Sequence, residues 1–364
     1  MASLETYHRT RNLQLNGYTV KTPILWFGTP IFGIPKPWTI LNEFEGLLVN
    51  AYEIYTNNRV KNLLDQIPLK EIIKFNGPIL MDSGGFYFQK KSQMSVKSKS
   101  IVEIYEKTKP EIVVSLDYPL NPNLTSSSDY YRLNKTTKYL KEMSDLLSSF
   151  DAEFMPVIHG YTLKQLEKSI NTIQPYTNRM IGIGSLVPLF RSTNGTKNVP
   201  RTNTKMNPKI FAIKAIKEVR DRFPDEFLHV FGVGGATTMH LMYLLGVDSI
   251  DSMAWRLKAA FGAIQLPGTP DRFLSPRKKR VHLSKKELEI FNKCKCPIHK
   301  HSIKEIENSF TLKAVHNSFV LKEEVEILHH YLENGSNVMD FFKRRFKSSS
   351  LGKIAEYAIK LIDN

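Results

Sequence analysis

Three acidic residues and one histidine stand at the ends of apolar runs, where a strand would give way to a loop. They are Asp82, Asp117, His159 and Asp251. Such side chains can supply a nucleophile and a proton donor, and two carboxylates in different environments can divide those roles. Acids also occur at strand ends simply as turn residues. Three acids and a histidine converging on one face argue for a reactive site instead.

The segment from His229 to Arg256 contains the candidate nucleophile. An apolar run over 228–233 ends in the glycine-rich turn 232–235, and a short amphipathic segment with apolar residues at helical spacing follows. A second apolar run then ends at Asp251. This order of strand, helix and strand places Asp251 at a strand tip, which is where barrels of parallel strands carry their chemistry.

Eight apolar runs of strand length are spaced along the chain, at 22–28, 46–50, 78–82, 112–117, 154–159, 180–184, 228–233 and 249–251. Helical patterns lie between them, at 53–75 in two pieces, 128–150 and 163–173. Alternating strands and helices predict an α/β fold, and eight strands favour a (β/α)8 TIM barrel over an open doubly wound sheet. No GxGxxG motif follows the first run, which also disfavours a dinucleotide-binding fold. We expect the barrel, with a lead-in hairpin before residue 22, to span 1–275.

A second group of residues has the composition of a metal site. Cys294, Cys296 and His299 supply three ligands at tight spacing, and zinc needs four. His316 is the best fourth ligand and His301 the second choice; two free cysteines near unrelated histidines are the alternative reading. Four protein ligands leave no open position, so we expect a structural Zn²⁺. Residues 276–364 would then form a zinc-binding subdomain with C-terminal helices at 321–347 and 351–362.

The charge balance points to a polyanionic partner. Lys and Arg outnumber Asp and Glu by 51 to 35, which gives a formal net charge of +16. The two cysteines are too few for a disulfide framework, so a reducing, cytoplasmic location fits. The chain shows no apolar stretch of transmembrane length and no signal peptide, and we expect no membrane association.

Several basic residues are candidates for contacts with nucleic-acid phosphates. Each basic run alone is typical of a solvated face, but together with the net charge the runs suit phosphate binding. The polar loop 191–206 is a further candidate contact. The candidate phosphate contacts are Arg256, Arg277, Lys278, Lys279, Arg280, Lys343, Arg344 and Arg345.

The motif Asp82-Ser-Gly-Gly-Phe86, the turn that begins at Gly232, and Asp251 followed by Arg256 resemble the tRNA-guanine transglycosylase superfamily. Its members are zinc-containing (β/α)8 barrels that exchange a guanine in a nucleic acid for a 7-deazaguanine base. The resemblance covers about residues 20 to 320. In such an exchange a carboxylate traps the sugar as an ester and a second acid manages the leaving group's proton. The target base must also leave its stack.

The resemblance implies a role for each matching residue. Asp251 resembles the nucleophile that attacks C1′, and Asp82 the second essential acid. Asp117 resembles the acid that reads the exocyclic amine and ring N–H of the purine, and His159 stands where the tRNA enzymes carry a glutamine. The base-binding residues that the resemblance implies are Ser83, Phe86, Asp117, His159, Gly184, Ser185, Leu186, Phe231 and Gly232, with Phe86 and Phe231 covering the two faces of the base.

Two departures from the family pattern indicate which branch the chain resembles. His159 replaces the glutamine, and His299 replaces a third cysteine, so that the zinc ligands read as Cys₂His₂. The chain is also compact and basic. Together these features make it look most like the DpdA branch, which inserts 7-deazaguanines into DNA. We therefore expect the replacement of guanine in DNA by a preQ0-type base, with retention, through a glycosyl-aspartate intermediate.

Other functions stay open at this point. The main alternative is a tRNA-guanine transglycosylase; a hydrolytic DNA glycosylase and a non-catalytic nucleic-acid-binding barrel are further ones. The expected partners are nucleic acid, a free 7-deazaguanine base and proteins of a DNA-modification system, in the cytoplasm of a bacterial or phage-infected cell.

Overall fold

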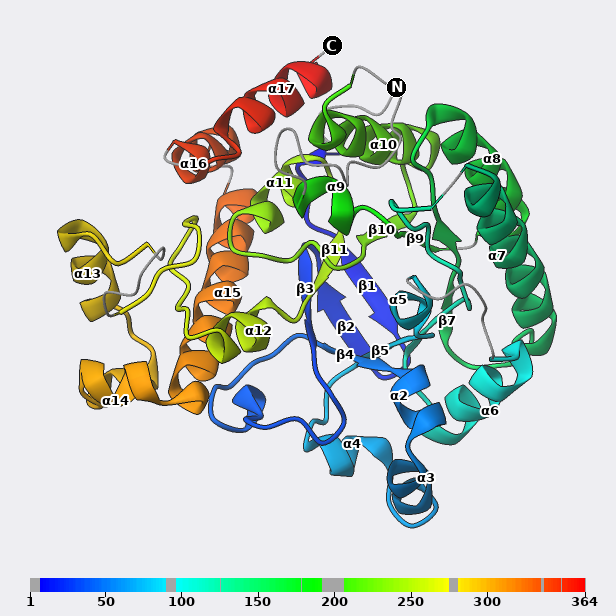
Figure 1. The fold of residues 1–364 in the computed structure, drawn as a ribbon, viewed down its shortest axis with the longest axis horizontal. Coiled ribbons are helices and arrows are strands. Elements are labelled where there is room, and N and C mark those ends of the chain that lie inside the picture. Colours follow the sequence, from blue (N-terminus) through cyan, green and yellow to red (C-terminus); the bar gives the residue numbers. More distant parts are fainter. Residues whose placement is uncertain are drawn as a thin grey trace.

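The computed structural model describes residues 7–89, 96–124, 126–177, 179–191, 206–274, 281–334, 337–347 and 349–363. A ring of parallel strands stands at its centre, with helices around it (Figure 1). The strand order is β7-β6-β5-β4-β3-β11-β10-β9-β8. The bounds are β3 (Ile24–Gly28), β4 (Leu47–Asn50), β5 (Ile79–Asp82), β6 (Ile112–Val114), β7 (Glu153–Met155), β8 (Val157–Ile158), β9 (Met180–Ile183), β10 (Phe227–Val230) and β11 (Ser249–Ser252).

The two ends of this order belong to one strand, and this closes the ring. Only Pro156 separates β7 from β8, and its carbonyl accepts the backbone N–H of Gly182 on β9 at 2.8 Å. Proline cannot donate to the ladder, so the strand is interrupted there without leaving the sheet. Counted this way, the described strands form an eight-stranded parallel barrel, and the expected (β/α)8 fold is confirmed.

The helices fill the connections between strands and extend beyond the last one. Their bounds are α2 (Ala51–Thr56), α3 (Asn58–Leu64), α4 (Leu69–Ile73), α5 (Gly85–Phe88), α6 (Ser98–Thr108), α7 (Ser126–Leu146), α8 (Leu163–Ile173), α9 (Val187–Arg191), α10 (Pro208–Arg222), α11 (Thr238–Leu244), α12 (Ala254–Ala260), α13 (Lys285–Asn292), α14 (Ile303–Asn308), α15 (Phe310–Glu333), α16 (Val338–Phe346) and α17 (Gly352–Asp363), with 3-10 turns η1 (Pro37–Thr39), η2 (Gln174–Tyr176) and η3 (Pro297–Lys300). None of the helices in the described part of the chain has both the length and the apolar character that crossing a bilayer requires.

Two helical expectations were wrong in detail, and side-chain caps explain both. The segment 53–75 forms three helices rather than two, because Asn57 accepts the N–H groups of Arg59 and Val60 and starts α3. The expected helix 321–347 is also two helices. Asn337 accepts the N–H of Asp340 and starts α16 anew, while α15 already begins at Phe310.

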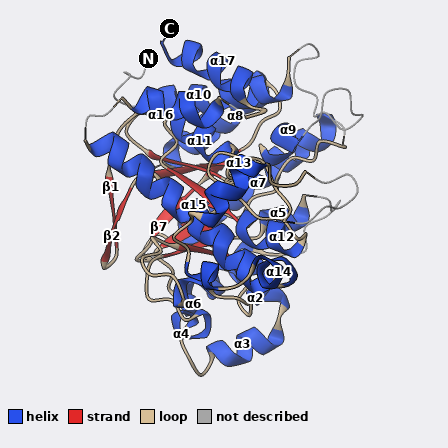
Figure 2. Cartoon of the chain, turned by 90° about the vertical axis from the view of Figure 1, so that its left-hand side faces the viewer, coloured by secondary structure: helices blue, strands red, loops and turns tan. Residues whose placement is uncertain are grey.

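The lead-in segment forms the expected hairpin and closes one end of the barrel. It consists of β1 (Asn12–Leu15) and β2 (Tyr18–Lys21), paired antiparallel. Leu13, Leu15 and Val20 are buried in one cluster with side chains of the barrel interior, among them Trp26 and Met155. In Figure 2 the hairpin lies on the side of the barrel opposite α5, α9 and α12. Chemistry is therefore left to the other end, where the strands terminate.

The long helix α15 joins the C-terminal elements to the barrel. It packs along α12 and reaches β3. Glu324 on α15 is fully buried. Its carboxylate lies 2.6 Å from His240 Nε2 of α11 and accepts a hydrogen bond from the Arg345 guanidinium of α16 at 2.7 Å. The expected domain boundary at residue 275 falls where the described residues are interrupted, so a separate subdomain over 276–364 stays a prediction.

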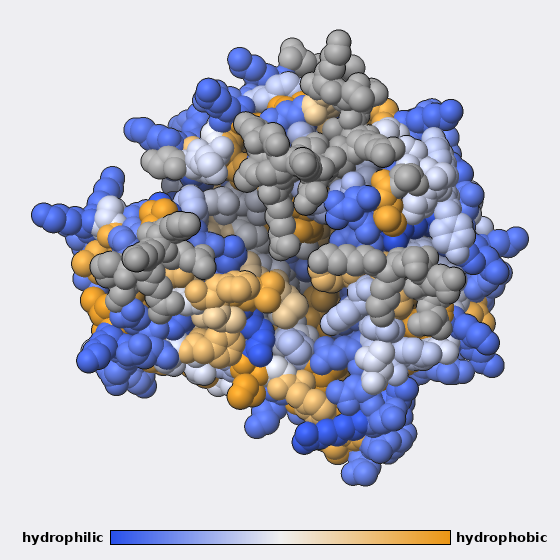
Figure 3. Space-filling view, in the orientation of Figure 1, coloured by the Kyte–Doolittle hydropathy of each residue, from blue (hydrophilic) through white to orange (hydrophobic). Residues whose placement is uncertain are grey.

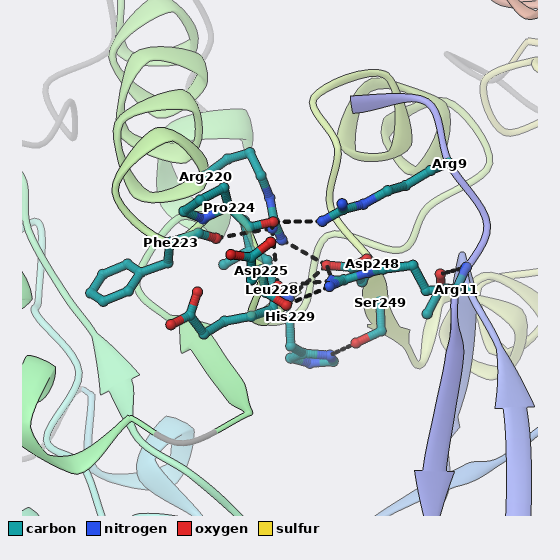
Figure 4. A network of polar contacts seen from close by, with 12 residues as sticks. Arg9, Arg11, Arg220, Phe223, Pro224, Asp225, Leu228, His229, Asp248 and Ser249 are labelled. Atoms are coloured by element: carbon teal, nitrogen blue, oxygen red, sulfur yellow. Dashed lines mark hydrogen bonds and ion pairs between the residues drawn. The ribbon is translucent and has the colours of Figure 1, made fainter. Parts of the chain in front are cut away.

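A buried charge network fixes the lead-in segment to the starts of β10 and β11 (Figure 4). Asp248 accepts hydrogen bonds from the Arg220 guanidinium at 2.6 Å, from Arg11 Nε at 3.0 Å and from the backbone N–H of Leu228 at 2.8 Å. The Arg220 side chain is only 1% exposed, and it also donates to the carbonyl oxygens of Phe223, Pro224 and Glu226. Two cations therefore depend on one carboxylate for their neutralisation.

The substitution Asp248→Ala should lower the free energy of unfolding by about 3–5 kcal/mol, since it leaves a buried guanidinium without its counter-ion. The control is Asp65→Ala, which breaks the exposed pair with Lys107 and should cost about 1 kcal/mol or less. Urea unfolding of both variants measures the difference. Equal losses would mean that the buried network contributes no more than a surface ion pair.

Candidate active site

A cavity of about 850 Å³ opens at the carboxyl ends of the strands. The three predicted acids line it together, with the aromatic rings of Phe86 and Phe231. Figure 3 looks onto this face and shows a central hollow with apolar side chains gathered beside it over α12. A volume of this size holds ligands larger than a single purine. The strand ends thus converge on one site, as the sequence pattern indicated.

Asp251 is held by the glycine-rich turn that follows β10. Its Oδ1 accepts the backbone N–H of Gly232 at 2.6 Å, and Gly232 has a φ of +74°. A Cβ at Gly234 would lie 2.5 Å from the carbonyl oxygen of Asp251, so only glycine allows this approach. Gly232 is among the predicted base-binding residues, but its N–H is bonded to the candidate nucleophile.

Asp82 lies in register with Asn50 on the neighbouring strand, and the two side chains are hydrogen-bonded. Asn50 Oδ1 accepts the N–H of Tyr52 at 2.9 Å, which leaves Nδ2 to donate to Asp82 Oδ2 at 2.7 Å. Burial, and then the nearby charges of Asp117 and Asp251, raise the pKa of Asp82 to about 8. The carboxyl group of Asp82 therefore keeps its proton near neutral pH and can serve as an acid.

His159 lies behind Asp117 rather than in the cavity wall. The ring is fully buried, and its Nε2 is 2.8 Å from Asp117 Oδ2. Ser185 Oγ accepts the N–H of Leu120 and lies 2.9 Å from His159 Nδ1, so its hydrogen can be donated to that nitrogen. The single ring N–H is then assigned to Nε2, which lies beside the carboxylate but is not well aligned for a hydrogen bond. His159 thus orients Asp117.

The remaining predicted base-binding residues divide into two groups. Phe86, 66% exposed on α5, lines the cavity, as do Phe231, Gly184 and Ser185. Ser83 and Leu186 are buried and do not line it. The Ser83 hydroxyl donates to the carbonyl oxygen of Ser115 instead, beneath Asp117. Asn50 at the end of β4 is a residue that the sequence patterns do not single out; its pairing register with Asp82 is what gives it a role.

Cys294, His299 and His316 form a group that could hold a metal ion, with their ligand atoms all within 4.8 Å of one another. Cys296 lies beside them, since a hydrogen bond from its thiol lowers the pKa of Cys294 to about 4. Nε2 of His299 is buried without a hydrogen-bond partner among the described residues. His316 presents Nδ1 to Cys294 and directs Nε2 to the carbonyl oxygen of Gln265 at 3.0 Å. His301 instead lies 3.8 Å from Glu305, outside the group.

Three of the four described basic residues of the predicted phosphate-binding set have partners within the protein. Arg256 donates to the carbonyl oxygen of Ile34, Arg344 to the hydroxyl of Tyr331, and Arg345 to Glu324. Lys343 is exposed on α16. Arg277, Lys278, Lys279 and Arg280, and most of the loop 191–206, lie outside the described residues. Phosphate binding by this set stays a prediction.

Comparison with known proteins shows the family to which the chain is similar. Residues 5–350 match the family model described as queuine tRNA-ribosyltransferase. The chain is 24% identical to the tRNA-guanine(15) transglycosylase of Pyrococcus abyssi over 90% of its own length and 53% of the relative's. It is 29% identical to that of Methanobrevibacter smithii over 68% of the chain and 36% of the relative. The chain therefore spans about half the length, or less, of these curated relatives.

Replacing Asp117 by Asn should lower the pKa of Asp82 below about 8, because it removes one of the negative charges that raise it. In the unmodified protein the Asp82 proton should persist through neutral pH and be lost as the pH rises through about 8. Carboxyl ¹³C chemical shifts of Asp-labelled protein measure both values. Asp271→Asn, at the cavity rim beside Lys258, is the control and should leave the titration unchanged. An Asp82 pKa near 4 in the unmodified protein would contradict the assignment.

Proposed function

The chain belongs to the queuine tRNA-ribosyltransferase family, and on that premise we propose that it is a pentosyltransferase that exchanges guanine in a nucleic acid for a 7-deazaguanine base. The observation that carries the proposal is the pairing of Asp82 and Asp251 in one cavity. Asp82 is kept protonated, whereas Asp251 accepts a backbone N–H and faces the same space. Two carboxyl groups in such different environments suit the roles of acid and nucleophile.

The proposed exchange consists of two displacements at C1′. A carboxylate oxygen of Asp251 forms a bond to C1′ while the bond to guanine breaks, and Asp82 gives its proton to the departing base. The incoming base then loses a proton to Asp82, its ring nitrogen attacks C1′, and the ester to Asp251 breaks. Two inversions give overall retention, and no water is consumed.

The recognition of the base falls to the opposite wall of the cavity. Asp117 can accept hydrogen bonds from the exocyclic amine and ring N–H of guanine, and His159 holds its carboxylate in place. Hydrogen bonds to a charged group contribute about 1.5–3 kcal/mol each, enough to select among bases. Phe86 and Phe231 line the same cavity and are proposed to stack on the flipped base.

The relatives favour tRNA as the nucleic acid, over the DNA that the sequence analysis put first. The matched proteins are named tRNA-guanine(15) transglycosylases, so tRNA is the first substrate to test. DNA is the second candidate. Its support is the two departures from the pattern expected of the tRNA enzymes, which are His159 and the Cys-His-His group. The net charge of +16 suits either polymer.

Incubation with labelled guanine and either unmodified tRNA or duplex DNA should transfer label into one of them. Asp251→Asn should lower the exchange rate by about 10³-fold or more and should form no denaturation-resistant adduct with the strand, because the nucleophile is gone. Chromatography of the nucleosides measures the label. Abasic sites without incorporated label would indicate a hydrolytic glycosylase, and binding without either product a non-catalytic barrel.

We further propose that the metal group binds a structural Zn²⁺ through Cys294, Cys296, His299 and His316. A thiolate set completed by imidazoles suits zinc, and the hydrogen bond from His316 to a carbonyl would orient that ligand. Cys296→Ser should lower the zinc content from about one per chain and the melting temperature together, since binding is coupled to folding. His301→Ala should change neither. Elemental analysis and calorimetry measure both; full occupancy in Cys296→Ser would exclude this ligand set.

A further inference from the structure

A histidine that plays no part in the exchange as described lies directly beneath Asp251. His229 on β10 is paired in register with Ser249 on β11, and the ring is fully buried. Its Nδ1 lies 2.8 Å from Ser249 Oγ, the contact drawn in Figure 4. Its Nε2 has no hydrogen-bond partner among the described residues and lies 3.5 Å from Asp251 Oδ1. A buried, unpartnered ring nitrogen therefore faces the candidate nucleophile.

The neighbours of the ring decide which nitrogen carries the hydrogen. If Nδ1 donated to Ser249, the lone pair of Nε2 would face the carboxylate, which is repulsive. If Ser249 donates to Nδ1, the hydrogen lies on Nε2 and faces Asp251 Oδ1, which is attractive. The second arrangement satisfies both groups. It repeats the arrangement at the other acid, where Ser185 meets Nδ1 of His159 and Nε2 faces Asp117.

We propose that His229, fixed by Ser249, is a positioning residue for Asp251 in the exchange reaction; the proposal rests on the proposed function. The N–H of Gly232 is hydrogen-bonded to Oδ1, and Nε2 of His229 lies 3.5 Å from the same oxygen, close enough to become a second donor as charge develops there. Oδ2 is then the oxygen that attacks C1′. Oδ2 forms the ester bond, and Oδ1 becomes the ester carbonyl oxygen. When the ester breaks in the second displacement, the returning negative charge is again stabilised by the two donors.

Two amide substitutions separate this role from simple packing. The amide of His229→Gln reaches about as far as Nε2 and can replace the donor to Asp251, whereas that of His229→Asn reaches only as far as Nδ1. His229→Asn should lower kcat by roughly 10- to 100-fold, the rate equivalent of a hydrogen bond to a charged group, with KM for the free base unchanged. His229→Gln should stay within a few-fold of the unmodified protein. Ser249→Ala should lower kcat by an intermediate factor, since the ring loses its orientation.

Chase experiments add a second readout. The covalent adduct formed by His229→Asn should be released by added free base more slowly than the unmodified protein's adduct, because its leaving carboxylate has lost a donor. Equal losses of kcat in the Asn and Gln variants, or a rise in KM with kcat unchanged, would overturn the role of His229. An unmodified protein that exchanges base in neither tRNA nor DNA would instead overturn the proposed function, and this role with it.

Discussion

Three carboxyl groups line one cavity, and the cost of burying their charges close together is the constraint around which the other polar groups are arranged. Coulomb repulsion is strong where water is scarce, so each acid needs either a proton or a donor. Asp82 keeps the proton, Asp251 takes the backbone N–H of Gly232, and Asp117 faces the ring of His159. The three acids can therefore have different catalytic roles because the charge of each is compensated in a different way.

The barrel positions the groups that contact the acids through the pairing register of its strands and through close approach of backbone to side chain. Asn50 meets Asp82 only because β4 and β5 pair in that register, and its amide is oriented by the N–H of Tyr52. A Cβ at Gly85 would lie 2.0 Å from Asp117 Oδ1, so the turn after β5 can approach that acid only as glycine. Small backbone features thus set the distances between the carboxyl groups.

Most of the strands and the three acids could be predicted from the sequence, but most of the contacts between side chains could not. Asp82, Asp117 and Asp251 could be placed because each ends an apolar run, and strand ends of parallel barrels meet at one face. The roles of His159 and His229 could not be placed, because each depends on a serine from the next strand, Ser185 or Ser249, that no local pattern connects to it. The division between α15 and α16 was missed although Glu333-Asn-Gly-Ser-Asn337 interrupts the apolar pattern with turn residues, and Asn337 then caps the new helix.

The Cys-His-His group and the cavity are connected through a single buried segment. His316 Nε2 contacts the carbonyl oxygen of Gln265, and Gln265 itself lines the cavity. The next residue on α15, Asn317, accepts the N–H of Gln265 and donates to the carbonyl oxygens of Trp255 and Ala263. Trp255 belongs to α12, which begins three residues after Asp251. A group that fixes His316 therefore also fixes the wall beside the nucleophile, so a structural metal ion would act on the reaction through position alone.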